Sequence, residues 1–343
     1  MRGLGRLGGW VLLLALALSL GSVRAWAQGA QRINYGETVE STIAEDDQRW
    51  VFTGAVGDVV LIDMVAAEDS QLDPLLSLLD SAGAVLVTDD DGGVGLNARI
   101  GPYVLPASGE YTIVASRYNG TGSYRLSLHT LNTAPLLRMG KPLRGAVSND
   151  TPREYYRLQA EAEEPQLVRL LVTGEGDLGG PKLVVYGPAG HPIVADMDAP
   201  NVLDPLLLLP QTRYIVEVGQ TEEGVGGAYT ITVAPADASL LQDGVPQRAQ
   251  LTASMYARRH YFIGQAGDVV QVTLEAEEGF LPALYVQQQG KDDVLFSGDG
   301  GAVNRFSATL TLPADGAYVV GIFEGQFAQA EAHYTLTVSW QAR

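Results

Sequence analysis

The stretch VFTGAVGDVVLIDMVA at Val51–Ala66 recurs as YFIGQAGDVVQVTLEA at Tyr261–Ala276. The two copies share Phe, two Gly, Asp, Val-Val and Ala at the same offsets, 210 positions apart. Half of that separation predicts a third copy between them, and GSY at 122–124 does recur as GAY at 227–229. A period near 105 residues is the length of a domain, not of a short solenoid repeat. The chain is therefore predicted to contain three tandem domains.

Apolar residues alternate with polar ones in short runs within each copy. Examples are DVVLIDM at 58–64 and YTIVA at 111–115, and Gly, Pro, Asp and Asn bound these runs. Beyond the N-terminal region, no stretch keeps a period of about 3.6 residues. This pattern predicts an all-β chain of sandwiches or barrels, with about seven to nine strands per copy. Gly57 and Gly267, each followed by Asp, are predicted to adopt positive φ in tight turns.

Residues 1–27 have the pattern of a secretory signal peptide. Arg2 and Arg6 form a basic start, Trp10–Leu20 is an apolar run, and the A-x-A site at 25–27 precedes Gln28. The apolar run is too short for a permanent membrane anchor. We therefore expect a secreted, periplasmic or cell-surface protein with no membrane span after signal cleavage.

The repeats are predicted at 33–131, 138–234 and 243–343, and the second is the most divergent. Pro135 and Pro235 lie in the short segments between them, which contain no long Ser/Gly tract. Neighbouring domains are therefore expected to lie close together.

Composition excludes several classes of function. Without residues 1–27 the chain has 19 basic and 40 acidic residues, a net charge of −21. Such a charge repels nucleic acid and anionic membranes. The chain has no cysteine, which excludes thiol catalysis, thiolate metal sites and disulfides.

The first repeat resembles the bacterial pre-peptidase C-terminal domain family. The resemblance lies in seven elements that occur in order: DDQRWVF at 46–52, GD at 57–58, LDP at 72–74, DSAG at 80–83, TDDDG at 88–92, LPxxGxY at 105–111 and GxY at 122–124. It is good in the third repeat and weak in the second. The resemblance implies jelly-roll β-sandwiches, related to collagenase collagen-binding domains and usually appended to secreted peptidases. The chain has room only for the three modules.

Two acidic clusters are candidate calcium ligands, because calcium prefers several hard oxygen ligands. The tentative ligands are Asp46, Asp47, Asp89, Asp90 and Asp91. In the collagen-binding relatives, the turn that Asp46 and Asp47 match holds calcium together with acids before the domain, and residues 28–34 contain none. The alternative is a pair of solvated turns in which Asp side chains accept hydrogen bonds from backbone amides.

No catalytic motif is present, and the chain has only four His residues. Aromatic residues near turns, such as Tyr103, Tyr118, Phe323 and Phe327, could stack on sugar rings. Trp50 and the repeated Tyr111, Tyr214 and Tyr318 suit packing inside the sandwiches instead.

We therefore predict an exported, non-catalytic binding or adhesion protein. Its expected partner is an extracellular polymer, either polysaccharide or protein, or an envelope component. The alternative is a docking, stabilising or targeting partner of a separately encoded secreted hydrolase. A third possibility, a hydrolase with an unrecognised site, would lose activity on mutation of His260 or His129.

Overall fold

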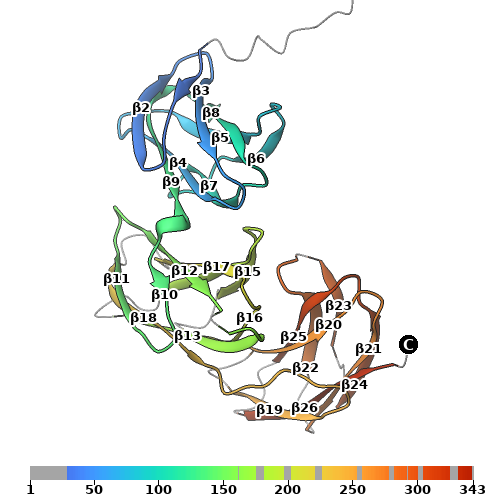
Figure 1. Ribbon diagram of the computed structural model, residues 1–343. Helices are drawn as coiled ribbons and strands as arrows, with labels where there is room; N and C mark the ends of the chain where they lie inside the picture. Colours follow the sequence, from blue (N-terminus) through green and yellow to red (C-terminus); the bar gives the residue numbers. More distant parts are fainter. Residues whose placement is uncertain are drawn as a thin grey trace, which may run out of the picture.

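The chain folds into three β-sandwiches that follow one another along the sequence (Figure 1). The computed structural model describes residues 29–160, 162–174, 181–196, 202–220, 226–252, 257–277, 282–291, 293–299, 304–324 and 331–341. The predicted signal peptide, residues 1–27, lies outside them. Six sheets contain nearly all the regular structure, so the predicted all-β fold is confirmed. Within these described ranges, no helix is long and apolar enough to cross a membrane.

Domain 1 is a two-sheet sandwich that ends in a short 3-10 helix. Its elements are β1 (Gln31–Arg32), β2 (Glu37–Ile43), β3 (Gln48–Gly54), β4 (Val59–Ala66), β5 (Asp73–Leu79), β6 (Val85–Asp89), β7 (Ala98–Val104), β8 (Gly109–Asn119), β9 (Gly122–Thr130) and the helix η1 (Leu131–Thr133). The sheets have the orders β1-β3-β8-β5-β6 and β2-β9-β4-β7. The chain passes repeatedly from one sheet to the other, as in a jelly roll.

Domain 2 repeats this strand order. Its strands are β10 (Leu136–Leu137), β11 (Leu143–Val147), β12 (Arg153–Gln159), β13 (Gln166–Gly174), β14 (Lys182–Tyr186), β15 (Pro192–Asp196), β16 (Val202–Leu208), β17 (Arg213–Gly219) and β18 (Gly227–Pro235). They form sheets β10-β12-β17-β14-β15 and β11-β18-β13-β16. The weak sequence match of the second repeat therefore still specifies the same topology.

Domain 3 has the same arrangement without a short first strand among its described residues. Its strands are β19 (Gln247–Thr252), β20 (Ala257–Gly264), β21 (Val269–Ala276), β22 (Pro282–Gln288), β23 (Val294–Asp299), β24 (Arg305–Thr311), β25 (Gly316–Glu324) and β26 (Glu331–Trp340). The sheets are β19-β26-β21-β24 and β20-β25-β22-β23. Each of the three sandwiches encloses its own apolar core.

The repeated Gly-Asp turns have the predicted backbone. Gly57 and Gly267 have φ of +80° and +82°, a conformation that glycine adopts without steric cost. Asp58 then accepts hydrogen bonds from the Ala55 N–H (2.9 Å) and the Tyr35 hydroxyl (3.0 Å). These side-chain bonds hold the turn closed in front of the buried strand β4.

The repeated tyrosines are structural. Tyr111, Tyr214 and Tyr318 are all buried, which confirms the packing interpretation. The Tyr111 hydroxyl donates to the Ala107 carbonyl oxygen at 2.7 Å and thereby ties the turn before β8 to the core. The Tyr214 hydroxyl instead accepts a hydrogen bond from the Leu209 N–H at 2.9 Å.

Neighbouring domains pack through the outer faces of their sheets. The first joint has an apolar cluster formed by residues of both domains: Val59, Val104, Leu131, Ala134, Tyr155, Tyr186 and Ile215. The second joint has a cluster of the same kind: Leu167, Leu207, Leu209, Leu240, Tyr261, Tyr285, Ala317 and Val319. The joints therefore hold successive domains in contact, as their short sequences suggest.

Candidate functional site

The predicted calcium ligands lie in two separate turns of domain 1: Asp46 and Asp47 before β3, and Asp89, Asp90 and Asp91 at the end of β6 and beyond it. The Asp89 Oδ1 accepts hydrogen bonds from the N–H groups of Gly92 (2.9 Å) and Arg99 (2.7 Å), so this carboxylate shapes the β6–β7 loop. Among the residues described, no group of three or more His, Asp or Glu side chains could hold a metal ion. Calcium binding stays a prediction, which calorimetric melting with calcium and with chelator would test.

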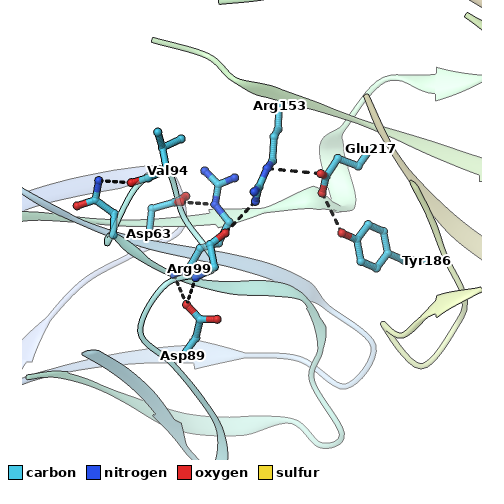
Figure 2. Close-up of polar contacts among 9 residues, drawn as sticks. Asp63, Asp89, Val94, Arg99, Arg153, Tyr186 and Glu217 are labelled. Carbon is cyan, nitrogen blue, oxygen red and sulfur yellow. Dashed lines mark hydrogen bonds and ion pairs between the residues drawn. The ribbon is translucent and has the colours of Figure 1, made fainter. Parts of the chain in front are cut away.

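Two ion pairs lie in the middle of the first joint (Figure 2). In domain 1, the Arg99 Nε donates to the Asp63 Oδ1 at 2.5 Å, and the two side chains are only 13% and 16% exposed. In domain 2, the Arg153 Nε lies 3.5 Å from the Glu217 Oε1, and the Tyr186 hydroxyl donates to the Glu217 Oε2 at 2.9 Å. Each domain therefore brings its own neutralised pair to the contact, which limits the cost of burying these charges.

Polar contacts also cross from one domain to the other. The Arg153 Nη1 donates to the Gly92 carbonyl oxygen of domain 1 at 3.0 Å. Further along the joint, the Arg213 Nη1 donates to the Asn132 Oδ1 (3.0 Å) and to the Gly57 carbonyl oxygen (3.3 Å). Because such bonds are directional, they set the relative orientation of the two domains, which apolar packing alone would leave less defined.

A recess of about 520 Å³ opens beside this network, between domains 1 and 2. Part of its lining is apolar: Leu61, Leu131, Ala134, Pro135 and Leu143. The rest is polar: His129, Thr130, Thr133, Arg144, Arg153, Glu154, Tyr155 and Tyr156. Small-molecule sites have volumes of about 300–1,000 Å³ and occur preferentially at domain interfaces, so both its size and its position make this recess the candidate site.

The carboxylate at the edge of the recess is held by its own domain. The Glu154 Oε2 accepts hydrogen bonds from the hydroxyls of Tyr156 (3.0 Å) and Tyr229 (2.5 Å) and from the Ala146 N–H (3.1 Å). A Cβ at Gly145 would collide with Glu154 and Tyr156, so glycine leaves the space that this cluster needs. Burial and the bond to Glu154 raise the pKa of Tyr229, which keeps this hydroxyl protonated and able to donate.

Two cationic or titratable side chains of the recess have no partner among the described residues. Arg144 and His129 are exposed, and within the described part of the chain neither side chain makes a hydrogen bond or ion pair. Arg153, by contrast, already bonds to Glu217 and to the Gly92 carbonyl oxygen. The recess therefore combines fixed polar groups with a guanidinium that is available to a ligand.

Domain 3 has a second, more polar recess of about 750 Å³, lined mainly by residues of β19, β26 and β21 and also by Arg258 of β20. The strand register places Arg248, Thr335 and Glu275 in one row across the sheet β19-β26-β21. Gln250 and His333 form the next row, and both line the recess. One side of the groove is therefore basic and the other acidic.

One close polar contact between two ring side chains recurs inside all three domains. The pairs are Trp50 with Tyr124 (3.1 Å), Tyr156 with Tyr229 (2.8 Å) and His260 with Tyr334 (2.7 Å). The other His260 nitrogen, Nδ1, lies 3.2 Å from the Gln247 Oε1. Burial, together with the nearby Arg258, lowers the pKa of His260 to about 3. His260 is thus a neutral core residue at a position that an aromatic residue fills in the other domains.

The aromatics considered as a stacking platform do not share one environment. Tyr118 is 70% exposed and Phe323 38% exposed, whereas Tyr103 is partly buried. Phe327 lies outside the described residues.

The recess between domains 1 and 2 was not predicted from the sequence. A signal for it exists: residues 138–157 contain five basic and two acidic residues, in a chain with 22 basic and 40 acidic residues in total. The apolar part of the lining was not detectable in this way, because it comes from three separate segments.

No family model matches the chain, and no curated protein matches it. Among solved structures, it is similar to the pre-peptidase C-terminal domain of a collagenase from Bacillus anthracis, with 19% identity over 29% of this chain and 93% of that one and a TM-score of 0.24. It is similar to the CUB1-EGF-CUB2 domains of rat MASP-1, with 11% identity over 59% and 99% of the two chains and a TM-score of 0.19. It is also similar to the secreted serine protease VesC from Vibrio cholerae, with 10% identity over 79% and 74% and a TM-score of 0.26. Membership of the pre-peptidase C-terminal family stays a prediction.

Proposed function

We propose that the mature chain is an exported, non-catalytic protein that binds an extracellular polymer. The observation that supports this proposal is the recess between domains 1 and 2. Part of its lining is apolar, and the Arg144 side chain in it has no partner among the described residues. Its walls come from two domains whose orientation is set by the contacts of Arg153 and Arg213. A preformed recess of this kind binds without the cost of first ordering its two halves.

The domain 3 groove is a second contact point at a fixed place on the same molecule. It is linked to domain 2 by the packed second joint, in which the Tyr261 hydroxyl donates to the Pro205 carbonyl oxygen (3.3 Å) and the Gln289 Nε2 to that of Leu207 (3.0 Å). Two weak sites on one molecule together bind a polymer of repeated units much more tightly than either site alone, provided that the polymer spans both sites. This is a mechanism for adhesion to a polymer.

The test is binding of the mature chain to immobilised polysaccharides, acidic and neutral, and to collagen, each compared with short fragments of the same polymer. We expect retention on at least one polymer, and an apparent affinity about 100-fold or more above that for its short fragment. If the chain binds none of these polymers but co-purifies with a secreted hydrolase, this would contradict the proposal and support the docking alternative.

A further inference from the structure

We propose that the recess between domains 1 and 2 binds a carboxylate-bearing sugar unit of an acidic polysaccharide. This inference rests on the proposed function and names the ligand class of the same site. It starts from an apparent contradiction, because a chain with a formal net charge of −18 repels anions at long range. The residues that line the recess differ in charge from the chain as a whole.

Two of the five cations in the segment 138–157 line this recess, Arg144 and Arg153, together with one acid, Glu154. Arg153 already pairs with Glu217, so its charge is balanced within domain 2. Arg144 lines the recess with no partner among the described residues. Its guanidinium can therefore bind a carboxylate in a bidentate, charge-assisted pair.

The rest of the lining favours a sugar over a purely apolar group. Thr130 and Thr133 contribute hydroxyl groups beside the apolar side chains of Leu61 and Leu143. A sugar ring presents hydroxyls at its edge and C–H groups on its faces, so it can satisfy both kinds of surface. A hydrocarbon chain would instead bury the polar lining groups without hydrogen-bond partners, which is unfavourable.

The anchored carboxylate of Glu154 adds selectivity within this class. Three donors hold its Oε2, so the side chain stays in place at the edge of the recess. A ligand carboxylate is repelled from Glu154 and attracted to Arg144, which orients an acidic sugar in one direction. A neutral sugar has no such preference.

The primary experiment is isothermal titration of the mature chain with trigalacturonate, its methyl ester and a neutral galactose trimer. The ester keeps the shape of the acid and removes its charge. We expect trigalacturonate to bind at least about 10-fold more tightly than the other two, because one charge-assisted pair contributes about 1.5–3 kcal/mol. Equal binding of acid and ester would overturn the inference while leaving polymer binding itself intact.

Variants then place the ligand on the molecule. Arg144→Glu should weaken trigalacturonate binding by about 10- to 100-fold, whereas Arg144→Lys, which keeps the charge but loses the bidentate geometry, should weaken it less. Arg125→Glu makes the same charge change at an exposed residue of β9 that lines neither recess, and it is the matched control. Unchanged melting temperatures would show that the variants are folded. Loss of binding with Arg125→Glu, retained binding with Arg144→Glu, or equal binding of a polyglutamate peptide by the unmodified chain would refute this assignment.

Discussion

Domain 1 and domain 3 have the same strand order and turn motifs, yet equivalent positions on their outer faces have different side chains and different contacts. In domain 1, Asp63 pairs with Arg99 across β4 and β7 and forms a mostly buried ion pair at the joint. The equivalent pair across β21 and β24 of domain 3 is Thr273 and Ser307, whose hydroxyls lie 3.1 Å apart. A single sheet position can therefore have either a mostly buried ion pair at a domain joint or a hydroxyl pair on an exposed face.

The two domains also differ inside the sandwich. Trp50 donates to Tyr124 in domain 1, whereas His260 bonds to Tyr334 in domain 3. The geometry is similar, but only the imidazole is a base that ordinarily gains a proton near pH 6.5, and burial lowers that pKa to about 3 in the folded domain. The same β-sandwich framework therefore accommodates side-chain pairs with different responses to pH.

The largest expected effect is selective acid destabilisation of domain 3. The pKa of His260 is about 3 in the folded domain and 6.5 ordinarily, so between these values the unfolded chain binds a proton that the folded domain does not. Stability therefore falls as the pH decreases from about 6.5 to about 3, by about 4 kcal/mol in total. Domain-resolved hydrogen exchange measured against pH tests this. His260→Tyr should flatten the dependence, and an equal decline in domain 1 would count against it.

The next effect separates a buried ion pair from an exposed one. Asp63→Ala leaves the Arg99 guanidinium buried without its partner and should destabilise domain 1 and the first joint by about 3 kcal/mol. The matched change in domain 3 is Glu275→Ala, which removes the exposed 3.2 Å pair with Arg305. That variant should lose less than about 1 kcal/mol. Urea unfolding followed by hydrogen exchange gives both values, and similar losses would show that burial at the joint is unimportant.

A smaller effect is expected at the small residue beside the repeated tyrosine. Gly145 pairs with Tyr229 in domain 2, and Ala249 pairs with Tyr334 at the equivalent place in domain 3. Gly145→Ala should destabilise domain 2 by about 2 kcal/mol, because the new methyl group overlaps Glu154. Ala249→Gly, the reverse change, is the control. Thermal melting that shows no loss for Gly145→Ala would mean that the Glu154 cluster readily moves.

The smallest effect sharpens the comparison of the outer faces. The double variant Thr273→Asp with Ser307→Arg transplants the domain 1 ion pair onto domain 3. Because Thr273 and Ser307 lie on an exposed face of domain 3, the pair should change the free energy of unfolding by less than about 0.5 kcal/mol. A stabilisation as large as the loss in Asp63→Ala would show that the pair acts without help from the joint.

The strands, the turns and the threefold repetition could be predicted because they depend on local chemistry. Alternating apolar residues fold into strands with one buried face, and Gly57 supplies a backbone conformation that few other residues tolerate. The repeated tyrosines were assigned to the core for the same reason, since a fixed place in the motif corresponds to a fixed place in the sandwich.

The candidate site was less predictable because its residues act across domains. The Asp89 to Asp91 turn was visible as an acidic run, but the structure shows that the Asp89 carboxylate accepts backbone hydrogen bonds. Arg144 and Leu61 lie 83 positions apart in sequence and line one recess only after two sheets dock. A charge run indicates where a side chain is exposed but not what lies opposite to it.

The sequence by itself determined three all-β modules, their turn chemistry and their internal tyrosines, because these features arise within about ten residues or within one repeat period. Tertiary structure alone decided that Asp63 and Arg99 are buried at a joint, that His260 is neutral, and that a recess forms between domains 1 and 2. The physical reason is that burial and electrostatic environment depend on which surfaces meet, and these contacts join residues far apart in the chain.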